Sequence, residues 1–375
     1  MSVMAGLDRL LPTYARTDLT IVRGEGCRVW DGDGREYLDF GGGIAVVSLG
    51  HCHPEPLAAV RAQLETLWHV SNLYRTEPAE ELASLLSARF GGAQAFFCNS
   101  GAEAIEAALK YARKATGKPG VVALEGSFHG RTLGALSATG QPGKRTVFEL
   151  LVPGVRFVQP NDVEALRRAA DEDVGLILLE PVLGEGGVVP LHTEFAAAAR
   201  ALPQLLCFDE VQTGVGRTGS FFAFEQLGVR PDLVTLAKGL ANGLPVGALL
   251  VADDAAGAFA PGDHGSTFGG NPVSCAAACA VVDAIDAELL DNVQSRGTQL
   301  AEALAPLPGV LSVRGRGLLV GIEVEGAAAD VVDAARESGL LVLTAGENVV
   351  RLAPPLTITA GDVDDALQIL DRIFC

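Results

Sequence analysis

One lysine near the middle of the chain directly follows an apolar run. Lys238 comes after LVTLA (233–237), and the ten positions that follow it hold no other charged residue. An amine that loses hydration at the end of a buried strand has a lowered pKa, and its neutral form is a nucleophile. Because most lysines are solvent-exposed, Lys238 indicates a catalytic amine only if other chemistry gathers beside it.

Two further apolar runs end in carboxylates. VGLILLEP (174–181) delivers Glu180, and QLLCFDE (204–210) places Asp209 and Glu210 directly after a strand-like stretch. A carboxylate at such a position could pair with a cationic ring nitrogen. A solvated strand end or a helix cap explains the same residues equally well when this segment is considered alone.

The segment CNSGAEAIEAALK (98–110) predicts a passage from strand to helix through Ser100 and Gly101. Backbone N–H groups at a helix start suit a phosphate, and glycine lets a ligand approach closely. Alone, the segment favours an ordinary N-terminal cap, with Ser100 as the capping residue and Glu103 at the third helical position.

The segment GSFHGRT (126–132) offers an aromatic ring and a guanidinium after another apolar run. Phe128 could stack on a flat ring, and Arg131 could hold a carboxylate in a bidentate fork. Core packing of Phe128 and a surface position for Arg131 are the simpler interpretation of this segment alone. Together with Lys238, an acid at a strand end and a phosphate cup, however, they match the needs of pyridoxal phosphate.

Two other patterns carry no function. GVGRTG (214–219) matches GxGxxG, but VQT separates it from the strand and no helix opens at its end, so a nicotinamide dehydrogenase is not supported. His51 and His53 lie two residues apart with no acidic partner beside them, so we assign no metal site.

The elements that would position these residues alternate between apolar runs and helical patterns from residue 93 onward. Continuous Val/Leu/Ile runs between helices predict an α/β fold with a mostly parallel, seven-stranded type of sheet covered by helices. Such sheets bind ligands beyond the carboxyl ends of their strands. We predict a large cofactor-binding domain over 49–255, a smaller C-terminal α+β domain over 256–375, and an N-terminal segment over 1–48 that joins the small domain.

Finer elements are also predicted. A strand, a DGDG turn and a second strand are expected within 18–40, and Pro54 could start a helix. Asn271–Pro272 predicts a helix start and a helix through about 290, followed by helices near 298–306 and from about 361.

The amino-acid composition limits the kinds of partner that the protein is expected to bind. The 375 residues carry a net charge of −18, which disfavours nucleic acid. No apolar run approaches a membrane span, and the N-terminus does not look like a signal peptide. Seven scattered cysteines without a framework indicate reduced thiols and a cytoplasmic protein.

Across nearly its whole length the chain resembles the class III aminotransferases, which are fold type I pyridoxal phosphate enzymes. The motifs that carry the resemblance are NSGAEA, FHGRT, LEPVLGEGG, FDEVQTGVGRTG, TLAKGLANGLPVG and HGSTFGGNP. Within the family, the chain is most similar to the subgroup that acts on N-acetylornithine. The resemblance implies amino transfer from N2-acetyl-L-ornithine to 2-oxoglutarate, a step of arginine biosynthesis, in a homodimer with a shared active site.

Matching positions imply residue roles. The catalytic residues would be Lys238, which is joined to the cofactor, Asp209, which is paired with its ring nitrogen, and Glu180; the cofactor would also contact Ser100, Gly101, Ala102, Phe128, Val211, Gln212 and, from the other subunit, Thr267. The substrate contacts would be Arg131 and Ser266 for the amino donor, Arg351 for glutamate, and Glu185 as a gate that pairs with Arg351.

One departure concerns donor choice. After GGGIAVV the chain has SLGH, beginning at Ser48, where the subgroup often carries asparagine at or just before that position. Other donors of the same class therefore remain alternatives: ornithine, succinylornithine, 4-aminobutyrate and a carrier-linked donor of lysine synthesis. A protein that binds pyridoxal phosphate without turnover is the alternative from another class, although binding alone would need neither Arg131 nor Arg351.

Overall fold

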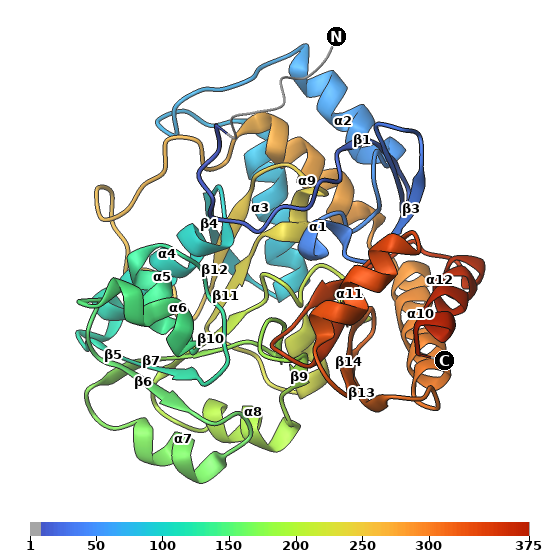
Figure 1. The fold of residues 1–375 in the computed structure, drawn as a ribbon. Helices are drawn as coiled ribbons and strands as arrows, with labels where there is room; N and C mark the ends of the chain where they lie inside the picture. The colour runs from blue at the N-terminus through green and yellow to red at the C-terminus, as the bar shows by residue number, and fades with distance from the viewer. Residues whose placement is uncertain (1–8, 375) are drawn as a thin grey trace.

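A computed structural model describes residues 9–374, and the first eight residues of the predicted N-terminal segment lie outside this range, as does Cys375. A seven-stranded sheet forms the centre, in the order β4-β12-β11-β10-β7-β5-β6 (Figure 1). Its strands are β4 (Ala93–Cys98), β5 (Gly120–Leu124), β6 (Val155–Val158), β7 (Val174–Leu179), β10 (Leu205–Asp209), β11 (Leu233–Leu236) and β12 (Gly247–Ala252).

Both faces of this sheet are buried. Leu176, Leu178 and Cys207 pack with Ile105 and Ala108 of helix α4 (Gly101–Thr116), whereas the alternate strand residues pack into the larger core on the other face. The period of two in a strand sends neighbouring side chains to opposite faces. The predicted fold class is therefore confirmed: apolar runs without alternation belong to strands covered on both sides.

The sheet is mostly, but not wholly, parallel. β12 runs antiparallel to both β11 and β4, while β10 is parallel to β11 and β7. Only residues 237–246 separate β11 from β12. A parallel crossover needs a dozen or more residues, so this short connection can only turn the chain back.

The predicted N-terminal strands form, with one correction. A break at residues 26–27 divides the first predicted strand into β1 (Ile21–Glu25) and β2 (Arg28–Asp31), and β3 (Glu36–Asp39) follows. β3 then pairs in parallel with β15 (Leu340–Leu341), which comes from the far end of the sequence. Gly26 has a φ of +55°, a left-handed value that favours glycine and turns the chain between β1 and β2.

The C-terminal part forms a second four-stranded sheet beside the large one (Figure 1, orange to red). It consists of β13 (Val310–Arg316), β14 (Leu319–Val324), β17 (Val349–Leu352) and β16 (Leu343–Thr344). A small hairpin joins β8 (Val182–Leu183) to β9 (Val189–Pro190).

The helices near residue 285 differ from the prediction. α9 (Pro272–Ala284) starts as predicted, with the Asn271 side chain accepting from the amides of Val273 and Ser274, but it ends before 290. α10 (Ala287–Leu304) begins far earlier than the predicted 298, because Asp286 caps it by accepting from the Leu289 amide at 2.8 Å.

The other helices are α1 (Gly42–Ala45), α2 (Pro54–Leu64), α3 (Glu77–Phe90), α5 (Leu133–Ala138), α6 (Pro142–Arg145), α7 (Val163–Ala169), α8 (Thr193–Arg200), α11 (Ala328–Glu337) and α12 (Ala360–Phe374). The 3₁₀ helices are η1 (Thr146–Phe148), η2 (Ala223–Leu227) and η3 (Lys238–Ala241). Within residues 9–374, none of the helices has the length and apolar character needed to cross a bilayer.

Candidate active site

A cavity of about 420 Å³ opens at the carboxyl ends of the parallel strands. Glu180 follows β7, Asp209 ends β10 and Lys238 follows β11, and all three line this cavity. Parallel strands bring their carboxyl ends to one edge of the sheet, which is where α/β proteins bind ligands. The structure therefore brings the three predicted catalytic residues together.

The start of α4 lines the same cavity through Ser100, Gly101 and Ala102. The Ser100 hydroxyl accepts from the Glu103 amide at 3.2 Å, and the Glu103 carboxylate accepts from the Asn99 amide at 2.8 Å. The helix cap does not rule out an anion site here, since the first amides of a helix have no acceptor within it. A Cβ atom on Gly101 would lie 2.8 Å from the Val211 side chain, so only glycine fits beside this wall of the cavity.

Asp209 is held from three directions. Its Oδ1 accepts from the Thr235 hydroxyl at 3.0 Å and from the Val211 amide at 3.1 Å, and its Oδ2 contacts Nδ1 of His129 at 2.7 Å. Burial opposes protonation of His129, but the hydrogen bond and charge of Asp209, with the charge of Glu180, raise the pKa of this imidazole. The carboxylate is therefore held in one orientation at the cavity wall.

His129 is the main residue that the sequence analysis did not assign. It is 3% exposed, lines the cavity, and its Nε2 has no hydrogen-bond partner within residues 9–374. The only signal in the sequence was its place in FHGRT, between Phe128 and Arg131. Nothing in that pattern says that its ring meets a carboxylate from β10.

Lys238 occupies a left-handed backbone conformation, with φ +44°, directly after β11. Such a conformation is unfavourable for a residue with a Cβ atom, and residues of this kind cluster at functional sites. Burial and the charge of Arg351 lower the pKa of the amine, against the opposing charges of Asp209, Glu185 and Glu180. The residue as a whole is half-buried, and it lines the cavity.

Glu180 is 4% exposed and accepts from the Phe128 amide at 2.9 Å. Burial, opposed by the charge of His129 and supported by that of Asp209, raises the pKa of Glu180 to about 7. This carboxyl group thereby fixes the backbone of Phe128, whose side chain lines the cavity. Arg131 is exposed and also lines it, with its guanidinium 5.5 Å from the Phe128 ring centre.

Arg351 is 3% exposed and reaches the cavity through a neighbour. Its Nη1 donates to Oε1 of Gln212 at 2.9 Å and to the Gly184 carbonyl at 3.1 Å, and Gln212 lines the cavity. Its Nη2 lies 3.6 Å from Oε1 of Glu185, whose other oxygen pairs with Lys144 at 2.9 Å. Lys144 is a second residue that the sequence analysis did not assign.

Ser266 and Thr267 do not line the cavity. The Ser266 hydroxyl accepts from the Asn99 side chain at 3.2 Å, which connects its loop to the start of α4. Thr267 is exposed. These two residues are the only predicted site residues outside both the cavity wall and the Arg351 contacts.

Ser48 lies behind the site and does not line it. Its hydroxyl donates to the Gly239 carbonyl at 3.2 Å, and it is 3% exposed. The cavity residue from this segment is Val46, which the sequence analysis did not assign. In this chain Ser48 therefore contacts the residue that follows Lys238.

The rejected GVGRTG segment (214–219) has a structural role. Arg217 is 2% exposed, and its Nη1 donates to the carbonyls of Leu318, at 3.1 Å, and Pro354. It thus ties the loop after β10 to the C-terminal part of the chain.

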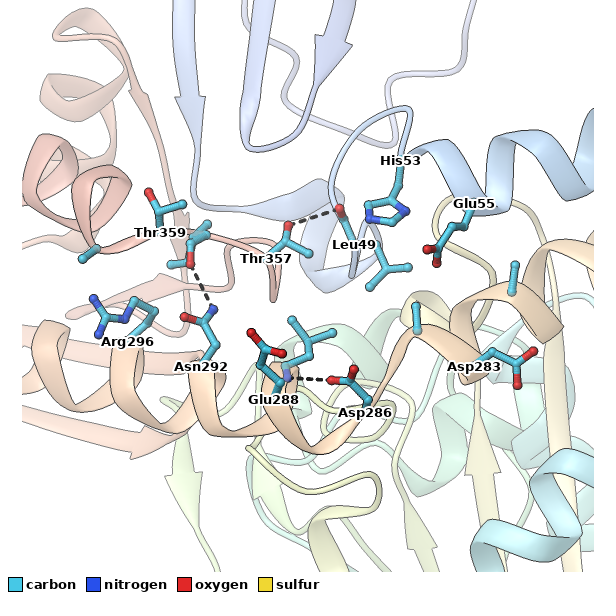
Figure 2. A pocket seen from close by; sticks show the side chains of 15 residues that line it. Leu49, His53, Glu55, Asp283, Asp286, Glu288, Asn292, Arg296, Thr357 and Thr359 are labelled. Atoms are coloured by element: carbon cyan, nitrogen blue, oxygen red, sulfur yellow. Dashed lines mark hydrogen bonds between the residues drawn. The ribbon is translucent and has the colours of Figure 1, made fainter.

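A larger cavity, of about 1000 Å³, lies away from this chemistry (Figure 2). His53 and Glu55 come from the N-terminal side, and Asp286, Glu288 and Arg296 from the α9–α10 region. None of the predicted site residues lines it. The smaller cavity is therefore the candidate active site, since it combines a perturbed amine with fixed carboxylates.

This smaller cavity fits pyridoxal phosphate by its donor set. It offers an amine of lowered pKa, a carboxyl group that could meet a ring nitrogen, an aromatic ring, and the start of a helix suited to a phosphate.

Comparisons with known proteins agree with this chemistry. Residues 12–374 match the family Aminotransferase class-III. The chain is 49% identical to an acetylornithine aminotransferase of Gloeobacter violaceus, covering 97% of this chain and 95% of that protein, and 45% identical to one of Bacillus cereus, covering 98% and 97%.

Solved structures of aminotransferases are also similar, at lower sequence identity. The ornithine aminotransferase of Toxoplasma gondii superposes with a TM-score of 0.93 at 34% identity, covering 98% of this chain and 92% of that one. The N-acetylornithine aminotransferase of Stenotrophomonas maltophilia gives 0.84 at 37% identity, covering 96% of each chain. This chain belongs to the class-III aminotransferase family and is a pyridoxal-phosphate-dependent aminotransferase.

Proposed function

We propose that this enzyme transfers the δ-amino group of N2-acetyl-L-ornithine to 2-oxoglutarate. The products are N-acetyl-L-glutamate 5-semialdehyde and L-glutamate, and the reaction serves arginine biosynthesis in the cytoplasm. The observation that carries the proposal is Lys238, with its lowered pKa, lining one cavity with Asp209 and Arg131 while Gln212 connects that cavity to Arg351. The names of the curated relatives supply the donor.

The residues that hold the cofactor would divide by chemistry. Ser100, Gly101 and Ala102 would hold its phosphate at the start of α4, Phe128 and Val211 would contact its ring, and Asp209 would pair with the ring nitrogen. When bound, pyridoxal phosphate supplies a carbonyl carbon that takes up the amine and a ring that withdraws electrons. Gln212 would contact the ring substituent next to that carbonyl.

Lys238 would move the proton. In its neutral form the amine would take a proton from the amine-bearing carbon of the donor and deliver it to the cofactor within the same half-reaction, and it would carry a proton in the opposite direction in the second half-reaction. Burial and the charge of Arg351 lower its pKa, so a larger fraction is neutral at physiological pH. Glu180 supports this geometry through the backbone of Phe128.

The arginines would select the substrates. Arg131, with Ser266, would receive the α-carboxylate of N-acetylornithine, and Arg351 would receive the α-carboxylate of glutamate or the matching group of 2-oxoglutarate. Glu185, 3.6 Å from Arg351, would neutralise that guanidinium while the donor is bound. Two anion sites of this kind would let an acidic protein bind a dicarboxylate.

A donor panel tests the assignment. The cofactor absorbance of the purified enzyme should change with N-acetylornithine and return with 2-oxoglutarate. Ornithine is the second candidate, because the Toxoplasma gondii ornithine aminotransferase has a similar fold. A higher kcat/KM for ornithine, succinylornithine, 4-aminobutyrate or a carrier-linked donor than for N-acetylornithine would reject the donor, and an unchanged absorbance with every donor would reject catalysis.

We also propose a homodimer in which Thr267 of each subunit completes the phosphate site of the other. Thr267 is exposed, and large apolar side chains are exposed nearby: Trp68 is 68% exposed, Leu73 is 87%, Tyr74 is 68% and Phe268 is 61%. The Asn72 side chain donates to the carbonyls of Ser266 and Gly269, so these residues share one surface. Exposed apolar patches of this kind mark interfaces.

Mixing two inactive variants tests the shared site. When Lys238→Ala and Thr267→Asp chains are mixed in equal amounts, about half of the dimers contain one chain of each kind, and one of the two sites in such a dimer is intact. The mixture should therefore regain about one quarter of the activity. Absence of any recovery after unfolding and refolding together would contradict the exchange of Thr267.

A further inference from the structure

The Glu185 carboxylate lies between two cations. Its Oε2 accepts from Lys144 Nζ at 2.9 Å, whereas its Oε1 lies 3.6 Å from Arg351 Nη2. The first distance is that of a charge-assisted hydrogen bond, and the second is outside hydrogen-bonding range. Glu185 is therefore bound more closely by Lys144 than by Arg351.

The three side chains come from separate elements. Lys144 lies on α6, Glu185 in the turn between β8 and β9, and Arg351 on β17. The Lys144 and Glu185 side chains are 25% and 24% exposed, whereas that of Arg351 is 4% exposed. Glu185 thus sits at the border of the buried region, with one cation on each side.

Lys144 also touches the cavity wall. Its Nζ lies 4.7 Å from the centre of the Phe128 ring, and Phe128 lines the cavity. A cation–π contact of this length restrains the ammonium beside the site. The lysine is therefore held where Glu185 can reach it.

We propose that Lys144 is a positioning residue for the gate: it shares the Glu185 carboxylate with Arg351, keeps the Glu185–Arg351 ion pair at 3.6 Å, and so makes it easier for the carboxylate of a dicarboxylic substrate to replace Glu185 at Arg351. This inference rests on the proposed role of Arg351. Without Lys144, Glu185 would have one cation left and would pair more closely with Arg351, and a dicarboxylate would then displace it less easily. The amine donor, during whose binding Glu185 neutralises Arg351, would be little affected.

The charges around Glu185 are consistent with this role. Burial raises the pKa of Glu185, but the charge of Arg351 and the hydrogen bond and charge of Lys144 outweigh burial and lower the pKa. Glu185 is therefore an anion at neutral pH. As an anion it is stabilised by the cations on both sides.

The test measures binding of glutarate, a dicarboxylate that cannot accept an amino group, to the cofactor-loaded enzyme by calorimetry. Lys144→Met should weaken glutarate binding about fivefold, which is the size expected for a partly exposed ion pair. Lys144→Arg should restore it to within about twofold of wild type. The KM for 2-oxoglutarate should rise in parallel, while kcat and the donor half-reaction stay within about twofold.

Two controls separate the gate from a general effect of charge. Lys118→Met removes a lysine just before β5, at the end of the strand opposite the site, and should leave glutarate binding unchanged. In a Glu185→Gln background, Lys144→Met should no longer weaken glutarate binding, because no anion remains to be moved.

Three results would overturn the proposal. Glutarate binding could be unchanged by Lys144→Met, it could be weakened equally in the Glu185→Gln background, or wild type could fail to bind glutarate at all. A wild-type enzyme that binds glutarate but does not use N-acetylornithine would instead reject only the proposed donor, since the glutarate comparison does not depend on it.

Discussion

Two groups of polar and charged residues in this enzyme differ in how they are fixed. The strand-end cluster, consisting of His129, Glu180, Asp209 and Thr235, is at most 4% exposed, and every one of these side chains makes a hydrogen bond. The rim cluster, consisting of Arg131, Lys144 and Glu185, is carried by loops and short helices and is more accessible.

The difference shows how chemistry and selectivity can be separated in one site. Side chains at strand ends are placed by the pleat and register of a sheet buried on both faces, so their geometry is rigid. Side chains on loops have alternative partners, as Glu185 has in Lys144 and Arg351. We therefore expect substitutions in or beside the first cluster to affect the chemical step and those in the second to affect substrate choice.

The largest effect is expected for Lys238→Ala, because Lys238 lines the cavity together with His129, Glu180 and Asp209 of the strand-end cluster. Without its amine, proton transfer should slow by at least about 10⁴-fold, because no other group replaces it. Steady-state rates with N-acetylornithine and 2-oxoglutarate measure this, with Lys118→Ala as a surface control. A residual rate within tenfold of wild type would show that another base acts.

Asp209→Asn should lower kcat by about 10²- to 10³-fold, because a fixed anion is lost from a water-poor site. The same change removes the partner of His129, so the raised pKa of this imidazole should fall. NMR titration of His129 in both proteins measures the second effect. An unchanged His129 pKa would show that the strand-end cluster does not act as a unit. It would thereby contradict the difference described between this cluster and the rim cluster.

Glu210, the neighbour of Asp209, is expected to stabilise the fold rather than to act in the chemical step. It is 1% exposed and accepts from the amides of Ala223 and Phe224 and from Thr213. Burial raises its pKa to about 7, against the opposing hydrogen bonds. The folded state then binds more protons than the unfolded state between the unperturbed value and pH 7, so stability falls as pH rises through this window.

Glu210→Gln should reduce this loss of stability. Between pH 4 and pH 8 the free energy of unfolding should fall by about 2 to 3 kcal/mol less in the variant than in the wild type. Denaturant unfolding at several pH values measures it. An unchanged slope would mean that Glu210 is ionised in the folded enzyme throughout the range.

The smallest effect belongs to the rim cluster. Glu185→Gln should raise the KM for N-acetylornithine by about three- to tenfold, because Arg351 then stays charged without its partner. Glutarate binding should strengthen, since no carboxylate competes with it. If kcat falls while both binding constants hold, Glu185 belongs functionally with the strand-end cluster.

The features that depend on local pattern could be predicted from the sequence. The Ser100 cap with Glu103 and the placement of Asp209 and Lys238 after apolar runs followed from short-range spacing. The reversal of β12 could also have been predicted, because residues 237–246 are too few for a crossover. Asp286 likewise marked the start of α10.

Contacts between distant segments could not be predicted in this way. The His129–Asp209 pair joins residues 80 positions apart, and the Lys144–Glu185 pair joins residues 41 apart. Both depend on how the loops after β5 and β7 fold over the sheet, which no periodicity reports. Family resemblance supplied the roles of Thr267 and Arg351, which local pattern alone did not.

The parallel pairing of Leu38–Asp39 with Leu340–Leu341 has a consequence for biosynthesis of the protein. β3 leaves the ribosome early, whereas its partner β15 is synthesised only after nearly the entire polypeptide. Such distant closure slows folding and leaves an unpaired edge exposed in the meantime. We therefore expect the nascent chain to depend on chaperones until translation ends, and C-terminal truncations before residue 340 to aggregate.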